Sequence, residues 1–317
     1  MHSLDLKAAI AQLHAGGLVV FATETVFGLG ADASQDAAVA AIYEAKDRPS
    51  FNPLIVHVGD ALQAQSLGVW NGQAEALAQA FWPGPLTLVL PKKAGANISK
   101  IVSAGSPNLA IRCPQPLQAR QLAAAFPNGI AAPSANKSGE LSPTREKHVR
   151  MAFADQPEIG FLAGDRPAVG LESTVIDISG PRALILRQGA VTKMQLAEIL
   201  GNVGEYERYL DDFRDEQVSS PGQLRRHYAP RVPLLLNQPS AGPGQALLAF
   251  GSQVPPAEWV FNLSERGDLI EAAARLFQGL HVLGGSGASA IAAMPIPVAG
   301  IGRAINDRLQ RGAVPLS

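Results

Sequence analysis

The chain has 317 residues but only one cysteine, Cys113, and few aromatic residues, at 6%. A single cysteine excludes an internal disulfide and any zinc site built on cysteines, which fits a reducing compartment. Neither sign of charge is in excess, because 26 Lys and Arg stand against 27 Asp and Glu. No overall basic field would therefore draw the protein to nucleic acid or to a membrane, and any site for a polyanion must be local.

Long apolar segments are missing as well. Residues 276–302 contain no Asp, Glu, Lys or Arg, but Gly, Ser and Pro interrupt them throughout, unlike a membrane-spanning helix. Residues 1–17 carry Asp5 and Lys7 inside their apolar pattern, which predicts an amphipathic helix and not a secretory signal. We therefore expect a cytoplasmic protein that does not contact the membrane.

Hydrophobic residues make up 47% of the chain, enough to bury a sizeable core and to form two domains. In the first part, short apolar segments such as 18–22 and 86–90 alternate with helical patterns such as 36–46 and 71–81. Such alternation predicts an α/β fold in which helices pack on a twisted, open sheet that is mostly parallel or mixed.

Three parts of the chain differ in pattern. Residues 1–200 hold these alternating elements and form the predicted main domain. Residues 201–231 are rich in Asp, Glu and Arg without a regular apolar period, which predicts a linker. Residues 232–317 contain further apolar strands and two helical patterns, which predict a smaller, Rossmann-like α/β domain with an accessory role and no cofactor of its own.

Cations recur beside loops rich in small polar residues. Lys46 and Arg48 lie two residues apart on a segment broken by prolines, so both can face one ligand, although a solvated loop is the alternative for this segment alone. Arg112 lies in an apolar strand, where it must pair with an internal carboxylate or line a site. Arg187 ends another strand, and residues 134–139 supply hydroxyl, amide and glycine groups after a third. This recurrence predicts a local site for phosphate groups.

Two common nucleotide motifs do not account for such a site. The GxxxxGK[ST] spacing of the Walker loop is absent. Residues 28–33 match the GxGxxA dinucleotide pattern only loosely, and Lys46 and Arg48 occupy the region where that pattern requires an acidic residue. A nicotinamide cofactor is therefore not expected, and a nucleotide must be held by another arrangement.

Seven ordered strings resemble the YrdC-like threonylcarbamoyl-AMP synthases over about residues 5–200: TETVFGLG, KDRPSFNPLIVHV, FWPGPLTLVL, AIRCP, APSANKSGELSPT, ESTVID and ILRQGAV. The string SSPGQLRRHYAP at residues 219–230 resembles the linker of the long, two-domain form. The resemblance implies synthesis of L-threonylcarbamoyladenylate from L-threonine, bicarbonate and ATP, with release of pyrophosphate, for the N6-threonylcarbamoyl modification of adenosine 37 in tRNA. It further implies Mg²⁺ on the ATP phosphates without a dedicated protein metal site, and transfer of the product to a tRNA threonylcarbamoyl transferase.

Carried over position by position, the resemblance implies specific site residues. The catalytic group at the nucleotide and pyrophosphate side would be Lys46, Arg48, Ser134 and Asn136. The further ATP contacts would be Asn52, Asn108, Ser142, Arg187 and Tyr228, of which Asn108 stands where other members often have threonine or serine. The threonine pocket would be Thr25, His57, Arg112, Ala132 and Ser173. In this pocket Arg112 would contact the amino-acid carboxylate with its two-pronged guanidinium, whereas a histidine such as His57, taken alone, is more often a core residue.

Two alternatives remain open. A double-stranded RNA-binding or tRNA-binding module would use the same cations as a basic groove, although such surfaces normally combine spread cations with stacking aromatic residues. Binding of tRNA is compatible with the synthase but not required by it. The linker ending at Tyr228 would either fold over the nucleotide as a lid or pack against the second domain.

Overall fold

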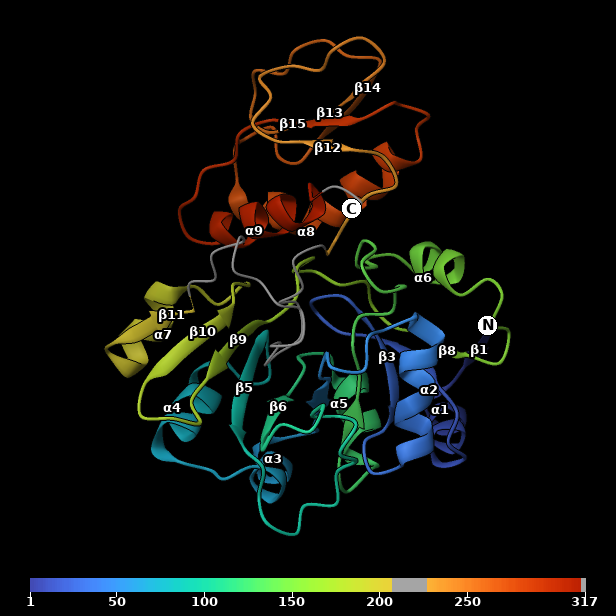
Figure 1. The fold of residues 1–317 in the computed structure, drawn as a ribbon, viewed down its shortest axis with the longest axis vertical. Coiled ribbons are helices and arrows are strands. Elements are labelled where there is room, and N and C mark those ends of the chain that lie inside the picture. The colour runs from blue at the N-terminus through green and yellow to red at the C-terminus, as the bar shows by residue number, and fades with distance from the viewer. Residues whose placement is uncertain (207–226, 315–317) are drawn as a thin grey trace.

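The computed structural model describes residues 1–206 and 227–314, which form two α/β units, each built on its own sheet (Figure 1). The segment 207–226, which contains most of the predicted lid, lies outside the described residues. The strands of the larger unit are β1 His2–Leu4, β2 Val19–Ala22, β3 Phe27–Asp32, β4 Ile55–His57, β5 Leu86–Pro91, β6 Asn108–Arg112, β7 Ile130–Ala131, β8 Gly160–Leu162, β9 Thr174–Asp177, β10 Ala183–Arg187 and β11 Val203–Glu205.

The large sheet is mixed. Its strand order is β1-β8-β2-β3-β7-β4-β6-β5-β9-β10-β11. Five of the ten strand pairings are parallel and five are antiparallel. Strand β11 lies within the residues predicted as linker and pairs with β10, so the sheet continues past residue 200. The helices of this unit are α1 Leu6–His14, α2 Asp36–Lys46, α3 Ala61–Leu67, α4 Gly72–Phe81, α5 Leu117–Ala124, α6 Glu146–Ala152 and α7 Lys193–Leu200.

The smaller unit has a four-stranded sheet of order β12-β15-β13-β14, with every pairing parallel. The predicted α/β class is therefore confirmed for both units. The elements of the smaller unit are β12 Leu234–Leu235, β13 Ala246–Ala249, β14 Trp259–Asn262, β15 Ile291–Ala293, α8 Leu269–Gly284 and α9 Gly302–Gly312.

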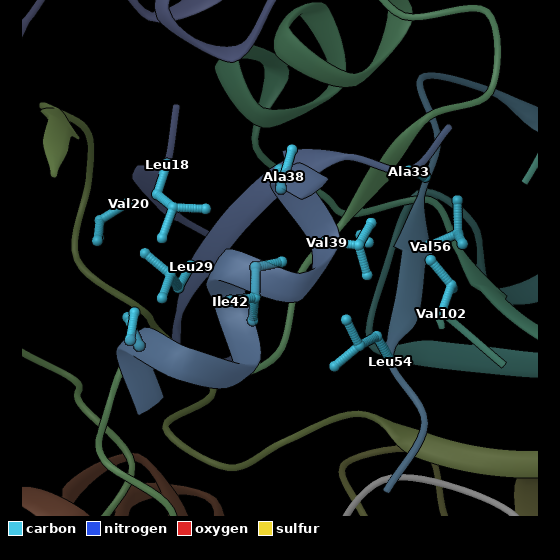
Figure 2. Packing of buried hydrophobic residues seen from close by; sticks show 14 of the residues in the cluster. Leu18, Val20, Leu29, Ala33, Ala38, Val39, Ile42, Leu54, Val56 and Val102 are labelled. Carbon is cyan, nitrogen blue, oxygen red and sulfur yellow. The ribbon is translucent and has the colours of Figure 1, made fainter. Parts of the chain in front are cut away.

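Helix α2 shows how packing places the first candidate cations. Its apolar face, which includes Val39 and Ile42, is buried against Leu29 and Leu54 from the sheet and the segment before β4 (Figure 2). The helix ends at Lys46. The next residue, Asp47, adopts a left-handed conformation with φ 52°, and the prolines that follow prevent a further turn. Lys46 is thereby held at the end of a packed helix.

The two units share a close interface. Leu141 and Leu171 of the larger unit join an apolar cluster with Leu276 and Phe277 of α8. Gly170 is required there, because a Cβ atom on it would lie 2.5 Å from the Cα of Ala274, and its φ is +74°.

Two histidine rings stack across the same interface. His148 of α6 and His281 of α8 have ring centroids 3.7 Å apart, with an interplanar angle of 20°. Burial, followed by the charge of His281, lowers the pKa of His148 to about 3. Burial also lowers the pKa of His281 to about 4. Both rings are therefore neutral at pH 7.

We expect acid to destabilise the protein through this pair. Because the folded-state pKa lies below the usual 6.5, the unfolded state binds protons first, and stability is lost as the pH falls below about 6.5. Between pH 6.5 and pH 5 the loss from His148 should be about 2 kcal/mol. Urea unfolding at pH 7.5 and pH 5.0 measures it. The His148→Phe variant should lose less stability over this interval, whereas His2→Phe, at an exposed position, should match the parent. An equal loss of unfolding free energy between pH 7.5 and pH 5.0 in all three proteins would contradict the role assigned to His148.

Candidate active site

One cavity in the larger unit brings together most of the predicted site residues. It lies where β3, β4 and the loop after β7 approach the segment that returns from the linker. Glu172 and His227 also line it, although neither was assigned a role from the sequence. The predicted residues on its wall are Thr25, Arg48, His57, Arg112, Ala132, Ser134, Arg187 and Tyr228.

Strand pairing creates one end of this cavity. His57 on β4 and Arg112 on β6 are register partners in a parallel pair. The Arg112 Nη2 lies 2.7 Å from Glu24 Oε1 without hydrogen-bond geometry, and both side chains are 4% exposed. Arg112 Nε also donates to the carbonyl of Gly84 at 3.3 Å. The two sequence-based alternatives for Arg112 therefore both hold, because it pairs with a carboxylate and lines the cavity.

His57 is a neutral, buried member of the cavity wall. Burial, reinforced by the charge of Arg112, lowers the pKa of His57 to about 3. Its ring meets Phe21 edge-on at 5.7 Å. The Nδ1 atom is buried and has no partner with good hydrogen-bond geometry among the described residues, although the backbones of Ile55 and Ile130 lie near enough to the ring to raise its pKa slightly. Since buried polar atoms are nearly always paired, this nitrogen is a candidate partner for a ligand.

Lys46 organises the loop after β7 at the other end. Its Nζ donates to the carbonyl of Ser134 at 2.6 Å and to the carbonyl of Asn136. The Asn136 amide in turn donates to the carbonyls of Lys137 at 2.8 Å and Glu140 at 3.0 Å. Burial, followed by repulsion from Arg48, lowers the pKa of Lys46 well below its usual value.

Arg48 is held by the turn that follows it. Its Nε donates to the carbonyl of Asn52 at 3.1 Å and its Nη2 to that of Pro53 at 2.8 Å. Burial lowers the pKa of Arg48 to about 10. The Asn52 side chain is buried as well, and its amide atoms have no partner among the described residues.

Arg187 is held on the cavity wall by Ser173. Its Nε donates to the carbonyl of Ser173 and its Nη2 to the hydroxyl of Ser173, each at 3.0 Å. The same hydroxyl lies 2.7 Å from that of Thr87 on β5. Burial also lowers the pKa of Arg187. Buried cations that lie close together favour an anionic ligand, because the ligand removes their mutual repulsion.

Tyr228 both lines the cavity and packs against the second unit. Its ring is buried, with Phe277 of α8 at 5.5 Å. The next residue, Ala229, donates from its backbone to the carbonyl of Gly139 at 3.0 Å. Tyr228 has a φ of 63°, a conformation that few non-glycine residues adopt. The two alternatives for Tyr228 are therefore compatible in this structure, and ligand-dependent closure stays a prediction.

Asn108 does not join the other predicted residues. It begins β6, four residues before Arg112, which places it about 13 Å away along the strand. Its amide donates to the hydroxyl of Ser179 at 2.9 Å.

Sequence reasoning missed Glu24, Glu172, His227 and Arg308. A signal for Arg308 existed, since it falls on the apolar face of α9 with Ile305 and Leu309, where a cation is unexpected.

Two features are absent from the described residues. Within residues 1–206 and 227–314, no group of three or more His, Cys, Asp or Glu side chains could hold a metal ion. In the same part of the chain, no helix is long and apolar enough to cross a membrane.

Comparisons with known proteins cover nearly the whole chain. Residues 11–189 match the Sua5/YciO/YrdC family model, described as telomere recombination, and residues 191–314 match the model of the threonylcarbamoyl-AMP synthase C-terminal domain. The threonylcarbamoyl-AMP synthase of Bacillus subtilis is 38% identical, over 98% of this chain and 93% of the relative. That of Pyrococcus abyssi is 34% identical, over 97% and 94%. The crystal structure of P. abyssi Sua5 complexed with L-threonine has a TM-score of 0.88 at 33% identity, covering 97% of this chain and 94% of that one.

Proposed function

Because the chain belongs to the threonylcarbamoyl-AMP synthase family, we propose that it makes L-threonylcarbamoyladenylate from L-threonine, bicarbonate and ATP and releases pyrophosphate. The product is the intermediate for the N6-threonylcarbamoyl modification of adenosine 37 in tRNA. The observation that supports this function best is the cavity itself, where three buried arginines, Arg48, Arg112 and Arg187, share one wall with small hydroxyl groups. Such a wall suits a triphosphate and an amino-acid carboxylate.

The chemistry needs positioning more than acid–base groups. The amine of threonine and bicarbonate give a carbamate and water. A carbamate oxygen then attacks the α-phosphorus in line, a new P–O bond forms, and the bond to pyrophosphate breaks. No serine nucleophile takes part in this sequence.

The roles of the side chains follow from their contacts. Arg112 is held by Glu24 and Gly84 and keeps further N–H groups for the carboxylate of threonine. Lys46 fixes the loop of Ser134 and Asn136 beside the phosphates. Arg48 and Arg187 supply positive charge where negative charge develops on the leaving pyrophosphate.

Magnesium is proposed to arrive with ATP. Among the described side chains of the cavity wall, Glu172 is the carboxylate, and it is already paired with Arg308 and with the Ser142 hydroxyl. This donor set does not suit a dedicated magnesium site, so phosphate oxygens and water would hold the ion. No step of the mechanism is derived through it.

A pyrophosphate-release assay tests the function. The full chain with ATP and Mg²⁺ should release pyrophosphate only when both L-threonine and bicarbonate are present. Release that persists without threonine would indicate simple ATP hydrolysis, and no release under the full mixture would reject the proposed function. The mass of the labile product, trapped on ice, gives a second readout.

The RNA-binding alternative is not favoured. Its cations would have to meet phosphates on an open surface, whereas Lys46 is 1% exposed and Arg187 7% exposed. Salt-sensitive RNA binding without pyrophosphate release would revive it.

The further partners are proposals from the chemistry. The adenylate is a reactive mixed anhydride, so the product should pass quickly to a tRNA threonylcarbamoyl transferase. The cytoplasm is the expected location, because ATP and tRNA are available there.

A further inference from the structure

The second unit sends one charged side chain into the wall of the active site. Arg308 of α9 is 0% exposed and is the largest fully buried side chain in the described part of the chain. It lies next to Glu172 and Tyr228, both of which line the cavity of the larger unit. A residue 136 positions away along the chain thus supports the catalytic wall.

One carboxylate links Arg308 to the nucleotide end of the site. The Arg308 Nε donates to Glu172 Oε2 at 3.0 Å. The other oxygen, Glu172 Oε1, accepts from the hydroxyl of Ser142, a proposed ATP contact. The residue after Glu172 is Ser173, which accepts two hydrogen bonds from Arg187. Through Glu172 and the residue next to it, Arg308 is therefore connected to Ser142 and Arg187, two groups that would contact ATP.

Tyr228 is the second point of contact. The guanidinium carbon of Arg308 lies 5.2 Å from the centroid of the Tyr228 ring. Helix α9 approaches the backbone of Tyr228 so closely that a Cβ atom on Gly312 would lie 2.7 Å from the Tyr228 carbonyl oxygen. Helix α9 thus determines where the ring can lie.

The positive charge of Arg308 contributes to the site in addition to its packing. An apolar residue would fill a buried position at lower desolvation cost. Without Arg308, however, Glu172 would present an unpaired carboxylate beside the triphosphate, where like charges repel. Arg308 offsets this charge and leaves Ser142 oriented by the same carboxylate. Arg308 also pairs with Asp307 at 2.8 Å, and Arg311 is the second partner of Asp307 at 2.9 Å, so the two carboxylates face two guanidinium groups.

We propose that Arg308 is a positioning residue for ATP, which neutralises Glu172 and holds the Ser142 hydroxyl and the Tyr228 ring in place, so that the second unit completes the nucleotide site. The inference rests on the proposed function for the identity of the ligand. It gives the C-terminal unit a defined part in the reaction.

The test compares three variants by calorimetric titration of the full chain with ATP and Mg²⁺ and by steady-state kinetics. Arg308→Met should weaken ATP binding by about 30-fold or more, while the KM for threonine stays within about threefold. The double variant Arg308→Met with Glu172→Gln removes both charges and should recover ATP affinity to within about fivefold of the parent. Arg308→Lys, which keeps the charge, should lie between the parent and Arg308→Met.

Arg303→Met is the matched control, because Arg303 is on the same helix and pairs with Glu205 at the surface. It should leave ATP affinity unchanged. Thermal melting checks that each variant is folded. If Arg308→Met does not fold, the double variant and Arg308→Lys decide the question.

Two results would overturn the proposal. The first is unchanged ATP affinity in a folded Arg308 variant. The second is a double variant that binds ATP no better than a folded Arg308→Met or, if Arg308→Met does not fold, a double variant whose ATP affinity is far below that of the parent. Because ATP binding is measured without turnover, this outcome is separate from the proposed function. A parent protein that binds ATP but releases no pyrophosphate with threonine and bicarbonate would reject the function and still leave the role of Arg308 decided.

Discussion

L-valine is expected to support pyrophosphate release at least about 10⁴-fold less efficiently than L-threonine, measured as kcat/KM. Valine has the size of threonine but replaces its hydroxyl with a methyl group. The Nδ1 of His57 is buried in the cavity wall without a well-aligned hydrogen-bond partner among the described residues. We expect the substrate hydroxyl to pair with it, so valine would leave a buried polar atom unpaired in the transition state.

Serine and one variant make this prediction specific. Serine keeps the hydroxyl and loses only a methyl group, so its efficiency should fall by about 10 to 200-fold. In His57→Leu the preference for threonine over valine should drop to about 10² or less, because an apolar pocket discriminates weakly between these two side chains. His148→Leu removes a buried histidine outside the cavity and should keep the parental preference. Valine turnover within tenfold of threonine would show that the threonine pocket is misassigned.

Replacing Arg112 with lysine is expected to weaken threonine binding by about 100-fold, with ATP affinity nearly unchanged. A lysine ammonium cannot contact Glu24, the Gly84 carbonyl and a substrate carboxylate with the geometry of a guanidinium. Lysine keeps a positive charge opposite the buried Glu24, so the loss falls on the geometry of the contacts and not on the charge balance of the pair.

Arg48→Ala should show the opposite pattern. Arg48 is held by the carbonyls of Asn52 and Pro53 at the proposed nucleotide end, so its loss should weaken ATP binding by at least about tenfold and spare threonine. Isothermal titration with each ligand measures both variants. Arg150→Lys, at an exposed pair with Glu146, is the matched control and should change neither affinity. If the effects of Arg112→Lys and Arg48→Ala were interchanged, the two substrates would occupy opposite ends of the cavity.

The helices and strands, and the kinds of side chain at the site, could be deduced from the amino-acid sequence alone. Apolar periodicity predicted a helix over residues 36–46, and α2 spans Asp36–Lys46. One of the two helical patterns predicted within residues 232–317 is also confirmed, because α9 spans Gly302–Gly312. Periodicity succeeds here because the pattern of a helix or strand depends on near neighbours in the chain. The motif order also identified the family, and with it most of the residues now found on one cavity.

The direction of each strand and the contacts between distant residues depend on how the elements pack in three dimensions. An apolar segment does not indicate whether the strand beside it runs parallel or antiparallel. The equal numbers of parallel and antiparallel pairings in the large sheet could therefore not be deduced from composition. The same limit applies to Arg112, because the sequence required a partner for a buried cation without indicating which of the 27 acidic residues supplies it. Asn108 and Arg112 are the first and last residues of one strand. Only the fold shows that the Arg112 end lines the cavity and the Asn108 end does not.

Arg308 shows most directly why a long-range partner cannot be predicted from the sequence. Its pairing with Glu172 exists only because two separate units pack together and bring α9 against the wall of the other unit. The free energy of that packing comes from apolar contacts spread over the whole interface, not from the residues adjacent to Arg308 in the chain. A charged residue on an apolar helix face was visible in the sequence, but its partner depended on how the two units dock.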